Sequence, residues 1–260
     1  MADPLVRSER IGDVVVLTLD DPPTRNALSW AMADVLHAAL EETRDARALV
    51  LAGAGKGFCS GGDLRMDGAG EEGFGEVLRQ GIARSINPLM LALADLEIPV
   101  IALVHGAAAG AGASLAISAD FTIMAEDGFL LLAFPRVGLA LDAGASWMLP
   151  RLIGPARATR ALMLAEPIHA RQACEWGIAH EVVPAADLRE HGLALAQRLA
   201  EGPTTAYGEI RRAVRLAQSS SYAEALQREC EAQQRTGDTA DCREAIAAFG
   251  EKRTPAFIGR

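Results

Sequence analysis

The sequence predicts an α/β fold followed by a helical C-terminal part. Short apolar runs alternate with helical patterns through the first half of the 260 residues, whereas helical patterns dominate the last third. That order is typical of an α/β core with helices appended after it. Hydrophobic residues make up 50% of the chain, which is enough to form a sizeable core.

Five apolar runs have the length and the flanking residues of buried strands. The first is at residues 14–19, where two aspartates and two prolines close it. Residues 48–52 and 100–104 form the next two runs. Shorter runs at residues 121–124 and 129–132 follow, so predicted strands dominate the first half of the chain.

Helical patterns separate and follow these runs. Ser29 is predicted to cap a helix that runs to about Asp45, with apolar residues at helical spacing. Residues 74–95 are also predicted to be helical, and so is most of the chain from about Ala143 onward. Small side chains in residues 105–120 predict a helix that packs closely against its neighbours.

Charge and composition exclude several classes of partner. The formal net charge is -9, and both nucleic acids and membrane surfaces are polyanionic, so neither is expected to bind. The four cysteines form no C-x-x-C pair, and we expect neither a zinc site nor a redox dithiol. No apolar segment reaches 18 residues, and the start of the chain does not read as a signal peptide. These features predict a cytoplasmic protein.

Two glycine-rich loops are the strongest candidates for a functional site. One contains Ser-Gly-Gly-Asp-Leu at residues 60–64, and the other, Gly-Ala-Gly-Ala-Ser at residues 110–114, opens a helix. Small side chains let a ligand approach the backbone, and two converging N–H groups make an oxyanion hole. Tight packing and ordinary turns remain the other interpretation. Leu115 breaks a dinucleotide-binding fingerprint, and Ala116 breaks a nucleophile elbow.

Six segments, in order, resemble the crotonase, or enoyl-CoA hydratase/isomerase, family, and together they cover nearly the whole chain. They are RNALS at 25–29, KGFCSGGDL at 56–64, PVIALVHGAAAGAGASLAISAD at 99–120, FPRVGLALDAGASWMLPRLIG at 134–154, A-x-x-x-G-I-A-x-E-V-V-P ending at Pro184, and FGEKRTPAF at 249–257. The resemblance implies a crotonase-like spiral of ββα units over residues 1–200. Residues 201–260 would then be a helical region that joins chains into homotrimers or hexamers.

The resemblance also implies a ligand and a set of site residues. The ligand is an acyl-CoA, with coenzyme A as part of the substrate and with no other cofactor or metal. The family's two oxyanion-hole donors map onto the backbone N–H groups of Gly62 and Ala111. The residues expected to contact the substrate are Arg25, Ala27, Ser60, Gly61, Asp63, Leu64, Ser114, Phe134, Leu139 and Lys252. Arg25 and Lys252 would meet the phosphates, with Lys56 or Arg253 as further candidates.

The sequence departs from the family's hydratases at two acidic positions. The two hydratase glutamates correspond to Ser114 and Phe134 here, so both acids are absent. Asp142 is the acid that remains, and some relatives with aspartate at this position are isomerases. We therefore expect an enoyl-CoA isomerase that stabilises an enolate and uses Asp142 to move one proton. A hydratase-type lyase that uses Asp142 with water, or a protein that binds acyl-CoA without turnover, is the alternative.

Asp142 itself has two interpretations from the sequence. It precedes a predicted helix, so it can act as an N-cap, and a helix start would lower its pKa. Burial among Phe134, Leu139 and Leu141 would instead raise the pKa and suit a base. The sequence leaves both open. Residues 65–80, rich in glycine and acid, are predicted to form a lid that shapes the acyl pocket.

Overall fold

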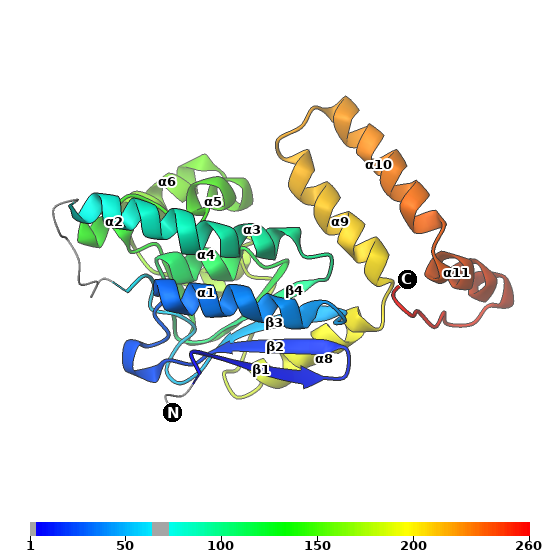
Figure 1. Cartoon of the computed structure of the whole chain (residues 1–260), viewed down its shortest axis with the longest axis horizontal. Coiled ribbons are helices and arrows are strands. Elements are labelled where there is room, and N and C mark those ends of the chain that lie inside the picture. Colours follow the sequence, from blue (N-terminus) through cyan, green and yellow to red (C-terminus); the bar gives the residue numbers. More distant parts are fainter. Residues whose placement is uncertain (1–3, 64–72) are drawn as a thin grey trace.

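Six strands form the main sheet of the structure, a computed structural model that describes residues 4–63 and 73–260 (Figure 1). In sheet order they are β1 (Val6–Ile11), β2 (Val14–Leu19), β3 (Ala48–Gly53), β4 (Val100–Val104), β6 (Phe121–Ala125) and β9 (Glu181–Val183). β1 pairs antiparallel with β2, and every other neighbouring pair in this sheet is parallel. Parallel neighbours need crossover connections, which the helices supply.

A second sheet of three short strands lies beside the segment that follows β3. β5 (Ala107–Ala109) pairs in parallel with β7 (Phe129–Leu131), which pairs antiparallel with β8 (Ile168–His169). Cys59 makes an isolated parallel bridge to Ala108, so the segment after β3 runs along β5. β4, β5 and the helix α4 (Ala111–Ile117) follow one another as one ββα unit. The predicted α/β fold with a helical C-terminal region is confirmed.

Helices cover both faces of the main sheet. α8 (Leu188–Ala200) packs on one face, in a buried cluster with Val16 and Val50. α1 (Trp30–Ala39) and α4 pack on the other face, where Leu17 belongs to a second cluster. Residues that alternate along each strand thus face different layers, as the pleat of a strand requires.

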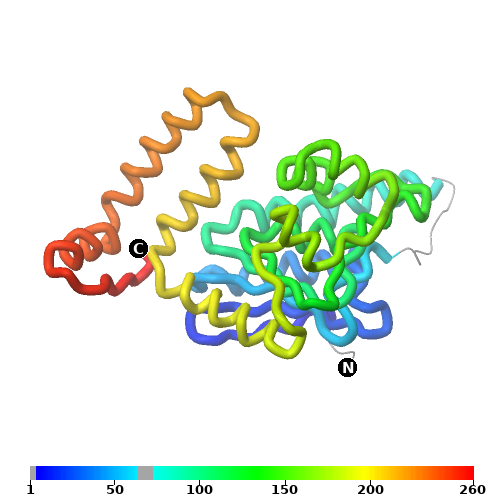
Figure 2. The backbone as a smooth tube through the Cα atoms, turned by 180° about the vertical axis from the view of Figure 1, so that it is seen from behind, coloured from blue at the N-terminus to red at the C-terminus, as the bar shows by residue number. Residues whose placement is uncertain are grey.

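The remaining helices pack around α1, α4 and the second sheet, or form an arm. Residues 74–95 make α2 (Phe74–Gly81), a π-helical turn (Ile82–Ile86) and α3 (Asn87–Asp95). Further along lie α5 (Ala145–Ile153), α6 (Pro155–Leu164) and α7 (Ala170–Glu175). The arm consists of α9 (Thr204–Ala217), α10 (Tyr222–Gly237) and α11 (Ala240–Glu251), and it projects from the core (Figure 2).

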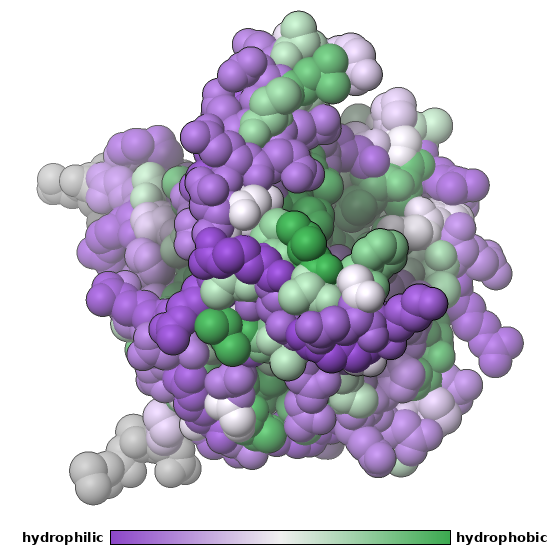
Figure 3. All heavy atoms as spheres, turned by 90° about the vertical axis from the view of Figure 1, so that its right-hand side faces the viewer, coloured by the Kyte–Doolittle hydropathy of each residue, from purple (hydrophilic) through white to green (hydrophobic). Residues whose placement is uncertain are grey.

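One half-buried ion pair anchors the arm to the core. Arg211 of α9 donates through Nε to the carboxylate of Asp120 at 2.5 Å, and it also donates to the Leu96 carbonyl beyond the end of α3. Figure 3 looks onto this end of the molecule, where apolar side chains are surrounded by polar ones. Among the residues described, no helix is long and apolar enough to cross a bilayer.

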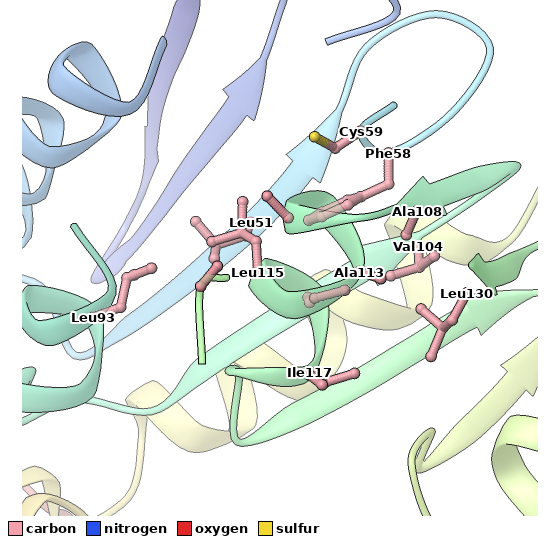
Figure 4. Packing of buried hydrophobic residues seen from close by; sticks show 14 of the residues in the cluster. Leu51, Phe58, Cys59, Leu93, Val104, Ala108, Ala113, Leu115, Ile117 and Leu130 are labelled. Atoms are coloured by element: carbon pink, nitrogen blue, oxygen red, sulfur yellow. The ribbon is translucent and has the colours of Figure 1, made fainter. Parts of the chain in front are cut away.

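Helix α4 is buried along its whole length and brings the site segments close together. Figure 4 shows Leu115 of α4 beside Leu51 of β3, in the cluster that also contains Phe58. A Cβ on Gly112 would lie 2.6 Å from the Cβ of Cys59, a separation that real atoms do not show. Glycine therefore lets α4 lie against the segment that carries Cys59.

The strands predicted from apolar runs are confirmed. Those at residues 14–19 and 100–104 have the predicted ends, and those at 48–52, 121–124 and 129–132 differ by one residue at one end. The helix predicted over 74–95 is also confirmed, with a π-helical turn inside it. The structure adds the strands β1, β5, β8 and β9, which the patterns did not predict.

Two predictions need correction or fall outside the structure. Ser29 caps α1 as predicted, with its Oγ accepting from the Met32 N–H at 3.1 Å. However, the α-helix ends at Ala39 and a 3-10 helix follows to Thr43, so the predicted end at Asp45 is wrong. Of the predicted lid, residues 65–72 lie outside the described residues, and residues 74–80 belong to helix α2.

Candidate active site

The two glycine loops lie side by side. The Cys59 N–H donates to the Ala107 carbonyl at 3.1 Å, and the Ala109 N–H donates to the Cys59 carbonyl at 2.9 Å. Gly61 follows with a φ of +100°, and a Cβ on it would lie 3.0 Å from the Ala109 oxygen. This parallel pairing therefore carries the two loops forward in contact, and it needs glycine at position 61.

The backbone N–H groups of Gly62 and Ala111 have no hydrogen-bond acceptor among the described residues. Gly62 is exposed, and a Cβ on it would meet no atom of the residues that the structure describes within 4 Å. Ala111 is the first residue of α4, where an amide has no acceptor within the helix. Two unpaired amides on neighbouring segments are the donors that an oxyanion hole requires.

Asn26 holds the first glycine loop in place. This fully buried side chain donates through Nδ2 to the carbonyls of Ala54 at 2.8 Å and Gly57 at 3.0 Å. Its Oδ1 accepts from the Asp21 N–H at 2.9 Å. This role of Asn26 was not predicted from the sequence. The available signal was its residue type, because asparagine tolerates the left-handed backbone that Asn26 adopts, with a φ of +59°.

Four residues predicted to contact coenzyme A lie together around this loop. The Arg25 carbonyl accepts from the Ser60 N–H at 3.0 Å, and the Gly61 carbonyl accepts from the Leu28 N–H at 2.8 Å. Ala27 lies between these two contacts and is buried, whereas the Arg25 side chain is exposed. The structure thus brings Arg25, Ala27, Ser60 and Gly61 into one group beside Gly62.

The other predicted contacts of the CoA track are not all in this group. Asp63 is half-buried next to Gly62, and Leu64 lies outside the described residues. Lys252 is exposed at the end of α11. Figure 1 places α11 and α2 at opposite ends of the molecule, and α2 is the helix that comes after the first glycine loop. The prediction that Lys252 joins the other site residues is therefore not met within one chain.

Asp142 lies between a 3-10 helix (Phe134–Val137) and α5. Its Oδ1 atom is buried and has no hydrogen-bond partner among the described residues. Burial raises the pKa of Asp142 to about 6, because the charged form loses hydration. A carboxyl group with this pKa is poised to accept and return a proton near neutral pH.

The interpretation of Asp142 as a helix cap is wrong. The N-cap residue of α5 is Gly144, and no side chain in residues 4–63 or 73–260 caps this helix. The Ala145 N–H donates to the backbone carbonyl of Asp142 at 3.1 Å, which leaves the carboxylate out of the helix start. Of the two opposing influences on the pKa of Asp142, burial therefore prevails over the helix dipole.

Three further predicted residues lie around the Asp142 turn. Ser114 of α4 is fully buried, and its Oγ is 3.5 Å from the backbone carbonyl of Asp142. Phe134 is buried, and its carbonyl accepts from the N–H of the half-buried Leu139 at 3.1 Å. Ser114 and Ala111 belong to the same helix, so α4 links the Asp142 turn to the second glycine loop.

The described residues do not favour a cysteine nucleophile or a metal site. Burial raises the pKa of the Cys59 thiol to about 11, so this cysteine stays neutral and is a poor nucleophile. No group of three or more His, Cys, Asp or Glu side chains in the described part of the chain could hold a metal ion. A groove of about 860 Å³ lies between the arm and the core, and no predicted site residue lines it.

The fold and the paired backbone amides define a protein of the crotonase type. The chain belongs to the enoyl-CoA hydratase/isomerase family, whose profile matches residues 9–260. It is 43% identical to a probable enoyl-CoA hydratase of Rhodobacter capsulatus, over 98% of both chains. It is 39% identical to the 1,2-epoxyphenylacetyl-CoA isomerase of Escherichia coli, over 95% of both chains. The crystal structure of an enoyl-CoA hydratase from Bacillus anthracis matches with a TM-score of 0.91 at 30% identity, over 99% of this chain and 100% of that one.

Proposed function

We propose that this protein is an enoyl-CoA isomerase, which moves a carbon–carbon double bond along an acyl-CoA through an enolate. The observation that carries the proposal is the carboxylate of Asp142, whose buried Oδ1 atom has no hydrogen-bond partner among the described residues and whose pKa burial raises to about 6. One base is sufficient for isomerisation, because the proton that it removes is the proton that it returns.

In this proposal the N–H groups of Gly62 and Ala111 donate to the thioester oxygen. Asp142 removes a proton from Cα of a 3-enoyl-CoA, and the electron pair of that C–H bond moves onto the thioester oxygen to give a dienolate. Return of the proton to Cγ leaves the conjugated 2-enoyl-CoA. Nothing is oxidised or reduced, so coenzyme A serves as the handle of the substrate and no redox cofactor is needed. Each amide donor contributes about 10²–10³-fold to the rate.

The residues at the two hydratase positions support an isomerase over a hydratase. Hydration needs one group to activate water and another to manage the proton at Cα. Ser114 and Phe134 occupy the positions of the two hydratase glutamates, and both side chains are buried. The name of the Rhodobacter capsulatus relative favours a hydratase as the second candidate, in which Asp142 would activate water. The absence of both glutamates favours a third candidate function, in which the protein binds acyl-CoA without turnover.

A paired assay tests the proposal. We expect the wild-type enzyme to convert 3-enoyl-CoA into the conjugated 2-enoyl-CoA, seen as a gain in thioester absorbance, and to leave 2-enoyl-CoA unhydrated. Asp142→Asn should lower kcat by about 10²–10⁴-fold. Asp127→Asn, at an exposed acid, should keep the wild-type rate. Below pH 6 the wild-type rate should fall with pH as Asp142 becomes protonated, and above pH 6 it should level off.

Two results would replace the proposal. Hydration of 2-enoyl-CoA that depends on Asp142 would make the protein a hydratase. Tight binding of acyl-CoA with no conversion of either substrate would make it a binding protein.

A further inference from the structure

The turn after Asp142 has a backbone that alanine seldom adopts. Ala143 has a φ of +48°, and Gly144 has a φ of +79° with a ψ of +7°. The Ala145 N–H closes the turn on the Asp142 carbonyl at 3.1 Å. Two central residues with positive φ define a type I′ turn, where glycine and asparagine predominate. Alanine is sterically disfavoured at the first of these positions.

Alanine gives this turn a buried methyl group, which glycine lacks. Ala143 is only 2% exposed and belongs to the main core cluster, together with Phe134 and Leu149. Its methyl group therefore anchors the turn in the core, whereas a glycine would avoid the strain and leave the turn free to move. A strained residue that persists where glycine fits more easily indicates a constraint on this turn.

The turn also determines what the Asp142 carboxylate can reach. Two left-handed residues separate Asp142 from Ala145, the first residue of α5. The amides of Trp147 and Met148 in the first turn of α5 donate to the Gly144 carbonyl, both at 3.0 Å. An aspartate at the N-cap would accept from such amides and lose basicity. Here the Oδ1 atom of Asp142 stays without a partner among the described residues.

We propose that Ala143 is a positioning residue: its buried methyl group pins the left-handed turn that keeps the Asp142 carboxylate away from the start of α5. The proposal rests on the proposed isomerase activity for its effect on rate. The orientation of Asp142 can be tested without substrate, so the two proposals can fail separately.

The kinetic test compares two alanines with the same backbone conformation. Ala165, at the end of α6, has a φ of +49° and is also 2% exposed. In both Ala143→Gly and Ala165→Gly, relief of backbone strain stabilises the folded protein, while the greater entropy of the unfolded chain destabilises it by a comparable amount. The melting temperature should therefore stay within about 4 °C of wild type. Ala143→Gly should lower kcat by about 10–100-fold with KM unchanged, because the base is misplaced. Ala165→Gly should keep the wild-type kcat.

The substrate-free test is a carboxyl NMR titration, with Asp142→Asn to assign the resonance. Burial is the sole cause, among the described residues, of the raised pKa of Asp142, so a carboxylate that swings out is expected to titrate normally. In Ala143→Gly we expect the pKa to fall from about 6 by at least one unit toward about 4. Ala143→Ser, which keeps a Cβ, should retain the wild-type pKa and kcat.

Three outcomes would overturn the proposal. One is an Ala143→Gly variant that keeps both the pKa and the kcat of wild type. Another is an equal loss of kcat in Ala143→Gly and Ala165→Gly, which would show a general effect on the fold. The third is a pKa in Ala143→Ser that falls as far as in Ala143→Gly. A wild-type enzyme that isomerises no enoyl-CoA would remove the proposed activity, while the titration would still decide the role of Ala143.

Discussion

Burial of the Asp142 carboxylate has a cost for folding that depends on pH. The pKa of this group is about 6 in the folded protein and 3.8 when unperturbed, so the fold favours the protonated acid. The cost is negligible below about pH 3, where both states are protonated, grows as the pH rises through 3.8 toward 6, and is complete above about pH 6. Asp142→Asn should therefore raise the free energy of unfolding by about 1–3 kcal/mol at pH 8.

Urea denaturation at two pH values checks this prediction. At pH 4 the gain in Asp142→Asn should be much smaller than at pH 8, because the wild-type group is then largely protonated in the folded state. Asp127→Asn is the matched control, and it should change stability at neither pH since this acid is exposed. A variant at residue 142 that loses stability at pH 8 would show that burial is not what raises the pKa.

Asn26 is the residue through which the fold holds the first glycine loop. Asn26→Ala leaves the carbonyls of Ala54 and Gly57 without these donors, and it places alanine at a φ of +59°. Each unsatisfied buried group costs about 1–3 kcal/mol. We expect the variant to lose about 2–4 kcal/mol of unfolding free energy in denaturant titration, and kcat to fall because Gly62 is less firmly held.

Asn87→Ala serves as the control for this variant. Asn87 is exposed at the start of α3, so its replacement should change the unfolding free energy by less than about 0.5 kcal/mol. If Asn26→Ala matched this control in stability and kept the wild-type kcat, the loop would not depend on the Asn26 side chain.

At the scale of elements, the sequence predicted those whose patterns reflect burial. β2 and β4 are fully or almost fully buried, and the apolar runs that predicted them are the residues that the helical layers cover. β1 has four exposed residues of six, because it is the antiparallel edge strand, so it carries no apolar run. β8 and β9 have two and three residues and are too short for a periodic pattern.

The candidate site was predictable where residue type alone decides the chemistry. Glycine loops and a lone acid are visible in the sequence, and the structure brings Gly61, Gly62 and Ala111 onto neighbouring segments. Asp142 was interpreted as a possible N-cap of α5 because the backbone conformation after it could not be predicted. The left-handed conformation of Ala143 removes Asp142 from the cap position, and nothing in an alanine predicts it. The distance of Lys252 from the loops follows from the direction of the arm, which no local pattern encodes.

Residues 258–260 connect helices α11 and α9 of the arm by hydrogen bonds, and we call this segment the clasp. The buried carboxylate of Asp241, at the start of α11, accepts from the N–H groups of Ile258 at 2.7 Å and Gly259 at 2.8 Å. The Gly259 carbonyl in turn accepts from the Thr205 hydroxyl of α9 at 3.1 Å. The Asp241 N–H also donates to the Arg260 carbonyl at 3.1 Å, so four hydrogen bonds connect the start of α11 to α9 through the clasp.

Replacing Asp241 should open the clasp locally. Asp241→Ala leaves two amides without acceptors, so we expect the free energy of opening for residues 240–251 to fall by about 2–4 kcal/mol. Hydrogen exchange measured by segment checks this, with residues 14–19 of the sheet as an internal reference that should not change. Asp238→Ala, at an exposed acid beside α11, is the control. Equal protection of α11 in wild type and Asp241→Ala would contradict the role of the clasp.

At the scale of the whole molecule, the arm exposes apolar side chains that the described part of the chain does not cover. Ile210 and Val214 of α9 are 57% and 59% exposed, and Ile246 and Phe249 of α11 are 70% and 87% exposed. Exposed apolar surface of this kind marks a protein interface. We propose that residues 201–260 are an oligomerisation region and that the protein forms homotrimers or hexamers, with the arm of one chain packed on another.

Phe249→Glu should break this assembly. A charge that must be buried at an interface costs several kcal/mol, so light scattering should show smaller species than for wild type. Met163→Glu is the control: Met163 is 71% exposed but lies on α6, which packs against α5 in the core. An unchanged mass in Phe249→Glu would exclude α11 from the interface.

The same variant tests how Lys252 could serve the site. Lys252 is three residues from Phe249 and remote from the glycine loops of its own chain, so a contact with coenzyme A requires a second chain. Dissociation by Phe249→Glu and removal of the charge by Lys252→Ala should then raise KM for acyl-CoA to a similar extent, and the double variant should be no worse than either. Additive effects on KM would mean that the two residues act independently, because residues that act through one contact do not add.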